Sequence, residues 1–170
     1  GSTFWFTARV GRHATAALAH AALPAGAREA PAEALPGDDV LRAWWQGRSV
    51  LLVEDNPINR EVAEELLTSV GLSTELAENG AIAVEHARAR HYDLILMDVQ
   101  MPVMDGLDAA RAIRALPGHA RTPIVAMSAA ALGEDRTAAQ SAGMDDFVAK
   151  PFAPATLHSV LLRWMPRNEA

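Results

Sequence analysis

Short apolar runs alternate with longer helical patterns along the chain from residue 49 onwards. Five of these runs have the length and composition of β-strands, and the middle ones are apolar throughout, which is typical of parallel strands covered on both faces. The five runs are "SVLLV" (49–53), "STELA" (73–77), "DLILMD" (93–98), "PIVAMS" (123–128) and "DFVAK" (146–150). The run at 73–77 alternates in polarity, so we expect it at an edge of the sheet.

A helical pattern follows each apolar run. The first pattern begins at Asn56 and Pro57, an N-cap residue followed by proline at the first helical position, and it ends near Gly71. The later patterns start at Asn79, Gly106 and Gly133, and the last one carries Leu157, Val160, Leu161 and Trp164 at helical spacing. Five successive strand–helix units predict an α/β fold, with a five-stranded, doubly wound parallel sheet in the flavodoxin-like order 2-1-3-4-5.

The segment before these units has a different composition. Residues 1–10, "GSTFWFTARV", favour a single strand because three adjacent aromatic residues are strong strand formers. Residues 11–48 are rich in alanine and interrupted by prolines, which break helices, so we interpret them as a linker that includes a helical turn near 38–47. The sequence therefore predicts one domain over residues 49–166 and a short tail over residues 167–170.

Composition excludes several classes of function. The 170-residue chain has a formal net charge of −6 and no Lys/Arg-rich run, which argues against a nucleic-acid partner. It contains no cysteine, so disulfides, thiolate catalysis and cysteine-based zinc sites are excluded. No long apolar stretch and no signal peptide are present, so we expect a cytoplasmic domain that makes no membrane contact.

Polar residues lie at the carboxyl ends of the predicted strands. Glu54 and Asp55 follow the first run, and Asp98 ends the third. Ser128 ends the fourth run, and Lys150 ends the fifth. Because the carboxyl ends of parallel strands share one edge of the sheet, where doubly wound proteins bind their ligands, we expect these side chains to form one site.

The acids at this edge indicate a metal ion. Two carboxylates about 4 Å apart repel each other by roughly 4 kcal/mol at an effective dielectric constant of 20, and the single ammonium of Lys150 cannot balance three of them. An oxygen-only ligand set without histidine or cysteine favours Mg2+. The alternative is that Glu54 and Asp55 only cap the following helix, whose N-terminus favours anions. The presence of Asp98 on the adjoining strand argues against that alternative.

Asp98 has the chemistry of a nucleophile. A carboxylate can attack phosphorus and form an aspartyl-phosphate. Phosphoryl transfer depends mainly on positioning and on charge stabilisation, which Mg2+, Lys150 and the Ser128 hydroxyl would supply to the phosphoryl oxygens. In isolation, Ser128 is an ordinary strand-end hydroxyl and Lys150 an ordinary surface lysine, but their shared edge favours a joint role.

Four segments together resemble the receiver domain of two-component response regulators, over about residues 49–166. They are "VLLVEDNPINREVA", "DLILMDVQMPVMDGLDAARAIR", "TPIVAMSA" and "AGMDDFVAKPF". The resemblance implies that Glu54 and Asp55 are metal-site acids and that Asp98 is both phosphoacceptor and metal ligand. It also implies that Gln100 lends its backbone carbonyl to Mg2+.

The same resemblance assigns roles to residues of the last two strands. Ser128 would be the hydroxyl switch, Phe147 the aromatic switch, and Lys150 the partner of the phosphoryl group. The peptide bond between Lys150 and Pro151 would be cis. Because the aromatic switch is Phe and not Tyr, any role of a hydroxyl at that position is absent.

The segments "DNPINREVA" and "MDVQMPVMDG" are most similar to receivers fused to hybrid sensor histidine kinases. Residues 1–10 resemble the last strand of the kinase ATP-binding domain, in which a Gly-Ser-x-Phe-x-Phe pattern recurs. The sequence has no phosphorylatable-histidine box, no Asn-rich nucleotide box and no Gly-rich ATP lid. We therefore expect that this chain is not itself a kinase but the C-terminal part of one.

Three functions remain as hypotheses. The first is a phosphoacceptor that takes a phosphoryl group from a phosphohistidine of the parent kinase onto Asp98. The second is an interaction domain that signals without phosphorylation, although the intact set of Asp55, Asp98, Ser128 and Lys150 argues against it. The third is an aspartate-nucleophile phosphatase, which would require a second acid where this chain has Gln100. Since only "PRNEA" follows Met165, we expect output through another protein, such as a His-containing phosphotransfer protein.

Overall fold

The computed structural model describes residues 37–129, 133–151 and 153–165. The strand predicted for residues 1–10, most of the predicted linker and the tail lie outside the described residues. Five parallel strands form one sheet in the order β2-β1-β3-β4-β5, which confirms the predicted fold class. The strands are β1 (Ser49–Val53), β2 (Ser73–Ala77), β3 (Leu94–Asp98), β4 (Ile124–Ser128) and β5 (Asp146–Ala149).

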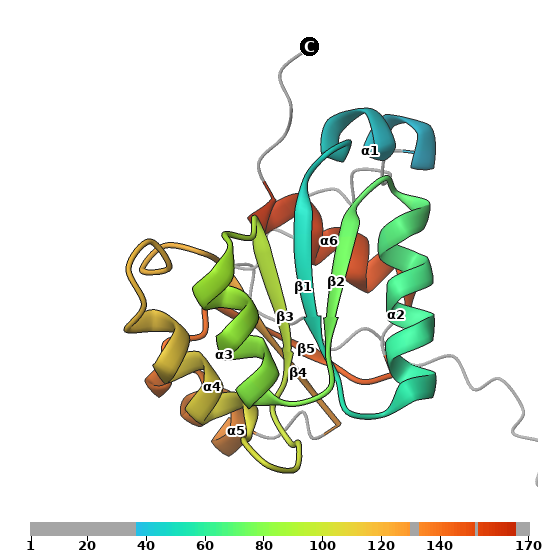
Figure 1. The fold of residues 1–170 in the computed structure, drawn as a ribbon. Helices are drawn as coiled ribbons and strands as arrows, with labels where there is room; N and C mark the ends of the chain where they lie inside the picture. The colour runs from blue at the N-terminus through green and yellow to red at the C-terminus, as the bar shows by residue number, and fades with distance from the viewer. Residues whose placement is uncertain (1–36, 130–132, 152, 166–170) are drawn as a thin grey trace, which may run out of the picture. The chain divides into compact units, whose positions relative to one another are not determined.

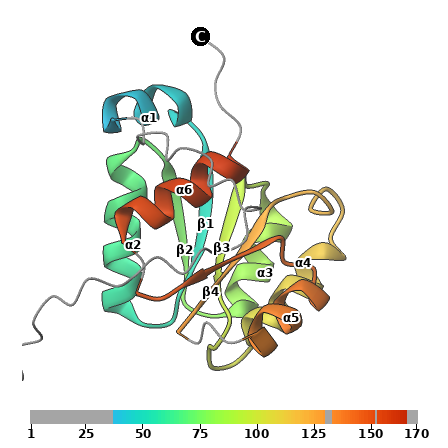
Figure 2. The same ribbon diagram turned by 180° about the vertical axis from the view of Figure 1, so that it is seen from behind.

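Helices cover both faces of the sheet. They are α1 (Asp38–Trp45), α2 (Pro57–Ser69), α3 (Gly80–Ala89), α4 (Gly106–Arg114), α5 (Gly133–Ser141) and α6 (Pro154–Trp164). Helices α2 and α6 lie on one face, and α3, α4 and α5 lie on the other (Figure 1 and Figure 2). Across the described part of the chain, we find no helix with the length and apolar character that spanning a bilayer requires.

The core has two layers because the side chains of a strand alternate between the faces of the sheet. On β1, Leu51 and Val53 pack toward α3, α4 and α5. Val50 and Leu52 pack toward α1, α2 and α6. All four side chains are fully buried, which explains why residues 50–53 are all apolar.

Strand register brings the predicted site residues to one edge. Val53 of β1 pairs with Met97 of β3, so Glu54 follows beside Asp98. On the other side of β3, Asp98 pairs with Met127 and therefore lies one position before Ser128. Since Ser128 pairs with Ala149, the next residue along β5 is Lys150. The carboxyl ends of four strands thus meet at the switch point of the sheet.

Helix α1 lies within the segment predicted as a linker. Its Leu41 and Trp45 side chains are completely buried in the layer that contains α2 and α6. Arg42 donates hydrogen bonds of 3.3 Å and 2.7 Å from Nε and Nη2 to the carbonyl oxygen of Ser69. Gly71, with φ of +86°, allows this approach, because a Cβ there would lie 2.8 Å from Arg42 Cγ. Helix α1 therefore packs against the amino end of β1 as part of the core.

Candidate functional site

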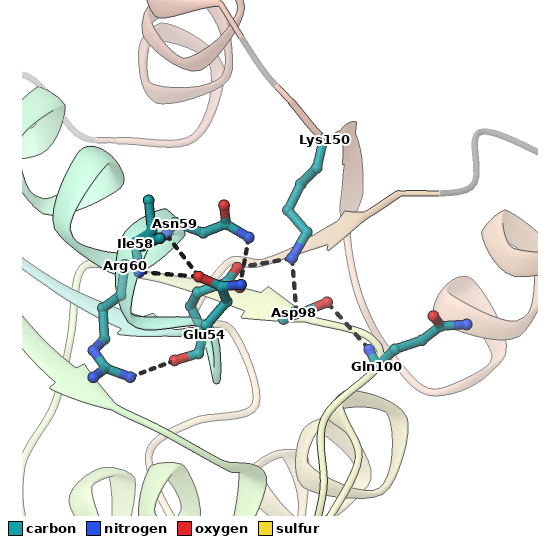
Figure 3. A network of polar contacts seen from close by, with 8 residues as sticks. Glu54, Ile58, Asn59, Arg60, Asp98, Gln100 and Lys150 are labelled. Carbon is teal, nitrogen blue, oxygen red and sulfur yellow. Dashed lines mark hydrogen bonds and ion pairs between the residues drawn. The ribbon is translucent and has the colours of Figure 1, made fainter. Parts of the chain in front are cut away.

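The carboxyl edge of the sheet holds a buried ionic network (Figure 3). Glu54 and Asp98 are only 2% and 4% exposed. The Lys150 ammonium lies between their carboxylates, 2.8 Å from Glu54 Oε2 and 2.7 Å from Asp98 Oδ2. Lys150 therefore joins two acids from strands β1 and β3 to the end of strand β5.

The first turn of α2 fixes Glu54. Asn56 caps this helix, since its Oδ1 accepts hydrogen bonds from the backbone N–H groups of Ile58 and Asn59 at 3.0 Å and 3.3 Å. Asn59 Nδ2 donates to Glu54 Oε1 at 3.1 Å. Arg60 Nη1 donates to the Glu54 carbonyl oxygen at 2.9 Å. With Lys150 on Oε2, both carboxylate oxygens of Glu54 have a donor.

Asp98 is held by the loop that follows it and by the start of helix α4. Its Oδ1 accepts a hydrogen bond of 3.1 Å from the backbone N–H of Gln100. Gly106, the first residue of α4, packs so closely that a Cβ at that position would collide with the carbonyl oxygen of Asp98. Its N–H donates to the carbonyl of Val99 at 3.0 Å. A glycine is therefore required for α4 to approach the end of β3.

Burial and pairing set the ionisation of the network. Burial raises the pKa of the Asp98 carboxyl, and the hydrogen bonds from Lys150 and the Gln100 backbone offset only part of that effect. For Lys150, burial alone would lower the pKa, but hydrogen bonds to Asp98 and Glu54 outweigh it and leave the pKa raised. The ammonium is therefore charged at neutral pH, and burial makes the Asp98 carboxyl lose its proton less readily than an exposed aspartate does.

The donor set fits a hard divalent cation. Glu54, Asp55 and Asp98 each offer a carboxylate oxygen, and these atoms all lie within 4.8 Å of one another. Within the described residues, the carboxylate of Asp55 makes neither an ion pair nor a hydrogen bond, and it is more exposed than the other two. An all-oxygen set with one open carboxylate matches the ligand preference of Mg2+.

The remaining predicted site residues lie around this network. Ser128 is 2% exposed at the end of β4, and its carbonyl oxygen accepts a hydrogen bond of 2.7 Å from the Lys150 backbone N–H. Phe147 is half-buried on β5 and packs against the core layer that contains α5. The peptide bond between Lys150 and Pro151 is cis, which is the isomer that the resemblance implies.

Sequence reasoning did not single out Asn59 and Arg60. Both belong to the segment "DNPINREVA", and the spacing from the N-cap Asn56 places Asn59 on the first helical turn. That spacing could have indicated that Asn59 lies near the site, because the first turn after β1 must lie over the carboxyl edge of the sheet. The hydrogen bonds to Glu54 depend on side-chain conformations that the spacing does not determine.

A pocket of about 330 Å³ opens beside the network. Polar atoms of Glu54, Asn59 and Lys150 line one part of it, whereas Val62, Ala129 and Pro151 supply apolar surface. The pocket gives outside groups a route to the Lys150 ammonium and to Glu54, which are otherwise largely shielded from solvent.

The chain matches the response regulator receiver domain over residues 50–162. It therefore belongs to the response regulator receiver domain family.

Two curated relatives are sensor kinases. The signal transduction histidine-protein kinase BarA of Escherichia coli (strain K12) is 42% identical over 118 residues, which cover 69% of this chain and 13% of BarA. The sensor histidine kinase GacS of Pseudomonas protegens is 34% identical over 151 residues, which cover 87% of this chain and 16% of GacS. The chain thus spans less than a fifth of the length of these relatives, and the GacS alignment extends into the residues before the receiver domain.

Two solved structures are similar over the receiver domain. The first is the receiver domain of the sensor histidine kinase PA1611 from Pseudomonas aeruginosa PAO1, which has a magnesium ion coordinated in its active site cleft. It is 47% identical, with a TM-score of 0.66, over 69% of this chain and 97% of that one. The second is a chain of the Saccharomyces cerevisiae complex between the histidine phosphotransfer protein Ypd1 and the receiver domain of Ssk1. It is 32% identical, with a TM-score of 0.66, over 72% of this chain and 90% of that one.

Proposed function

We propose that this domain accepts a phosphoryl group from a phosphohistidine onto Asp98, as one step of a two-component phosphorelay. The observation that supports this most strongly is the buried network in which Lys150 lies 2.7 Å from Asp98 Oδ2 and 2.8 Å from Glu54 Oε2. A carboxylate with an adjacent fixed ammonium is suited to act as a nucleophile toward phosphorus, since the cation then stabilises the charge on the transferred group.

In the proposed step, a carboxylate oxygen of Asp98 forms a bond to phosphorus while the bond from phosphorus to the donor's imidazole nitrogen breaks. The electron pair of the broken bond stays on that nitrogen. The Lys150 ammonium exchanges its hydrogen bond with Asp98 for one with a phosphoryl oxygen. The hydroxyl of Ser128, at the end of the neighbouring strand, binds another phosphoryl oxygen.

Glu54, Asp55, Asp98 and the backbone carbonyl of Gln100 would hold Mg2+, which supplies charge neutralisation for the phosphoryl group. The three carboxylates within 4.8 Å of one another support this assignment. The magnesium ion in the PA1611 receiver domain, which is 47% identical, supports it further. Asp55 is the ligand most accessible to an arriving ion, because its carboxylate is the most exposed of the three.

Ser128 and Phe147 would transmit the phosphorylated state. Movement of the Ser128 hydroxyl toward the phosphoryl group vacates space beside β4, and the half-buried Phe147 ring then moves into it. The expected readout is a changed surface over α5, β5 and α6. The position of Phe147 between the core and α5 supports this role.

The parent protein would be a hybrid sensor histidine kinase. Residues 1–10 would be the last strand of its ATP-binding domain, residues 11–48 the linker, residues 49–166 the receiver and residues 167–170 the tail. The end of that linker, helix α1, packs onto the receiver core. The alignment with GacS, which reaches into the residues before the receiver, supports this arrangement.

The phosphodonor would be the kinase's own phosphohistidine domain, and the recipient a His-containing phosphotransfer protein, as the Ypd1–Ssk1 complex suggests. This part of the parent would lie in the cytoplasm.

The test is phosphorylation by a small donor. The protein is incubated with acetyl phosphate and Mg2+, and its intact mass is measured. We expect the gain of one phosphoryl group by the wild type, no gain by Asp98→Asn, and no gain when Mg2+ is chelated. If the folded wild-type protein remains unmodified, or if Asp98→Asn is modified equally, the phosphoacceptor function is wrong. The phosphorylation-independent interaction domain would then be favoured.

A further inference from the structure

Asn59 occupies a position that helix stability does not explain. It is the third residue of α2, after the N-cap Asn56 and Pro57. A glutamate at this position would complete a capping box and would interact favourably with the helix dipole, whereas asparagine is a poorer helix former. Within this site, however, a glutamate would place another negative charge beside Glu54. Asparagine is one methylene shorter and offers a neutral donor instead.

The side-chain amide of Asn59 donates a hydrogen bond to Glu54. Asn59 Nδ2 donates to Glu54 Oε1 at 3.1 Å, while Lys150 Nζ donates to Glu54 Oε2 at 2.8 Å (Figure 3). The Glu54 side chain is thus fixed from two directions, by the helix on one side and by the lysine on the other. The same ammonium contacts Asp98 Oδ2 at 2.7 Å. A continuous chain of contacts therefore leads from Asn59 through Glu54 and Lys150 to Asp98.

We propose that Asn59 is a positioning residue for phosphoryl transfer, an inference that rests on the proposed function. It holds Glu54 in the conformation that keeps the Lys150 ammonium between Glu54 and Asp98. Asn59 does not touch the reacting atoms, and its influence reaches them through Lys150. Loss of the amide frees one oxygen of Glu54, so the carboxylate turns away and Lys150 is no longer fixed beside the oxygen that receives the phosphoryl group.

Two substitutions separate positioning from a structural role. Asn59→Ala removes the donor. Asn59→Asp keeps the shape but replaces the donor with a carboxylate, which repels Glu54 and adds negative charge near the three acids. Both should slow phosphorylation at saturating acetyl phosphate and Mg2+, roughly tenfold for Asn59→Ala, as expected for the loss of a hydrogen bond to a charged group. We expect a larger loss for Asn59→Asp.

Metal affinity provides the second readout. We expect Mg2+ to bind Asn59→Asp more tightly than the wild type in calorimetry without donor, because the added carboxylate increases the negative potential of the site. A residue with a purely structural role would weaken both properties together. A slower phosphorylation together with unimpaired Mg2+ affinity would show that the loss of rate does not come from loss of the metal site or of the fold. Glu61→Ala, an exposed change on the same helix, is the control and should leave both properties unchanged.

The inference is overturned if both Asn59 variants are phosphorylated within about twofold of the wild-type rate, a difference well below the loss of one charged hydrogen bond. It is also overturned if Asn59→Asp binds Mg2+ more weakly and melts at a lower temperature in proportion to its loss of rate. These failures differ from a failure of the proposed function, in which the wild-type protein itself gains no phosphoryl group.

Discussion

The two edges of the sheet both carry charged side chains, but they balance charge differently. At the amino edge, acids and bases pair one to one. Asp93 accepts hydrogen bonds of 3.1 Å from Arg48 Nη1 and 2.8 Å from the backbone N–H of Ser49. Asp145 accepts hydrogen bonds of 2.6 Å from Arg114 Nη2 and 2.8 Å from the N–H of Ile124. Asp93 thereby fixes the first residue of β1, and Asp145 fixes the first residue of β4.

At the carboxyl edge, three acids outnumber the cation that pairs with them. Among the described residues, Lys150 bonds to the carboxylates of Glu54 and Asp98, whereas Arg60 bonds to a carbonyl oxygen. The side chain of Asp55 remains open. Helix α1 lies over the amino end of β1 (Figure 1). A pocket lined by Glu54 and Lys150 opens beside the carboxyl edge. The paired charges of the amino edge stabilise the fold, whereas the excess of acids at the carboxyl edge suits a cation and, under the proposed function, an incoming phosphoryl group.

The largest effect on stability should come from a substitution in helix α1, at the amino edge. Trp45→Ala removes a completely buried indole of α1 from the core layer with α2 and α6. We expect a loss of about 3–5 kcal/mol in the free energy of unfolding, as for other large aromatic side chains replaced by alanine in a core. Urea denaturation followed by circular dichroism measures this.

Trp45→Phe is the matched control. It keeps most of the apolar volume and removes the indole N–H, which has no hydrogen-bond partner among the described residues. The expected loss is smaller than that of Trp45→Ala, because the cavity left behind is smaller. If Trp45→Ala costs no more than Trp45→Phe, helix α1 is not an integral part of the core.

The amino edge should also give the protein a pH-dependent stability. His119 is 1% exposed, and burial lowers its pKa. The backbone of Ala87 and Arg90 raises this pKa, but burial together with the charges of His91, whose ring stacks on it at 4.8 Å, and of Arg114 outweighs that effect. The unfolded chain therefore binds a proton to this histidine more readily than the folded chain does. The free energy of unfolding should fall as pH drops below about 6.5, the ordinary value for histidine, toward the lower value of the folded state.

His119→Gln tests this assignment. Its free energy of unfolding, measured by urea denaturation at intervals between pH 7 and pH 5, should decline less steeply than that of the wild type. The variant will be less stable at pH 7, because it loses the contact between His119 Nδ1 and Thr122 Oγ1 at 3.2 Å. The test is therefore the slope of the free energy of unfolding against pH. Equal slopes for the two proteins would show that another group causes the pH dependence.

At the carboxyl edge, removing a charged side chain should not lower the stability of the metal-free protein. Asp55→Ala relieves repulsion among the three acids, so without metal its melting temperature should equal or slightly exceed that of the wild type. Mg2+ should raise the melting temperature of the wild type and leave that of Asp55→Ala unchanged. A strong destabilisation of metal-free Asp55→Ala would mean that Asp55 stabilises the fold, as Asp93 does at the other edge.

The smallest effect on phosphorylation itself is expected for Ser128→Ala. The variant should still be modified on Asp98, because the nucleophile, Lys150 and the acids remain. It should fail to transmit the modification to α5, β5 and α6. Backbone amide chemical shifts recorded before and after phosphorylation measure this. If these shifts respond equally in the wild type and in Ser128→Ala, the hydroxyl is not the switch.

Much of the fold could be predicted because its signals are local. The apolar runs give the five strands, and the alternating run at 73–77 is the edge strand β2. The element boundaries shift by about one residue for physical reasons. Strand β3 starts at Leu94 because the Asp93 carboxylate binds the start of β1, and β4 starts after Pro123, which has no N–H to donate.

The site could be predicted as a group of residues, but its internal contacts could not. Strand ends meet at one edge by topology, so the proximity of Glu54, Asp98 and Lys150 follows from the order of the sheet. The bonding of Lys150 to both acids, and that of Asn59 to Glu54, depends on side-chain conformations chosen in the folded environment. The packing of Trp45 could not be predicted either, because a short helix after a proline-rich segment has no pattern that shows which surface it covers.

The most direct test of the account is to locate the phosphoryl group by chemistry. The protein is treated with acetyl phosphate and Mg2+, the acyl phosphate is reduced with borohydride, and the peptides are sequenced by mass spectrometry. Reduction converts a phosphorylated aspartate to homoserine, so the modified position is read directly. If Asp98 is the phosphoacceptor, homoserine appears at position 98, with Asp55 and Glu54 unchanged. Modification at another carboxylate, or at none in a folded and Mg2+-saturated protein, would contradict it.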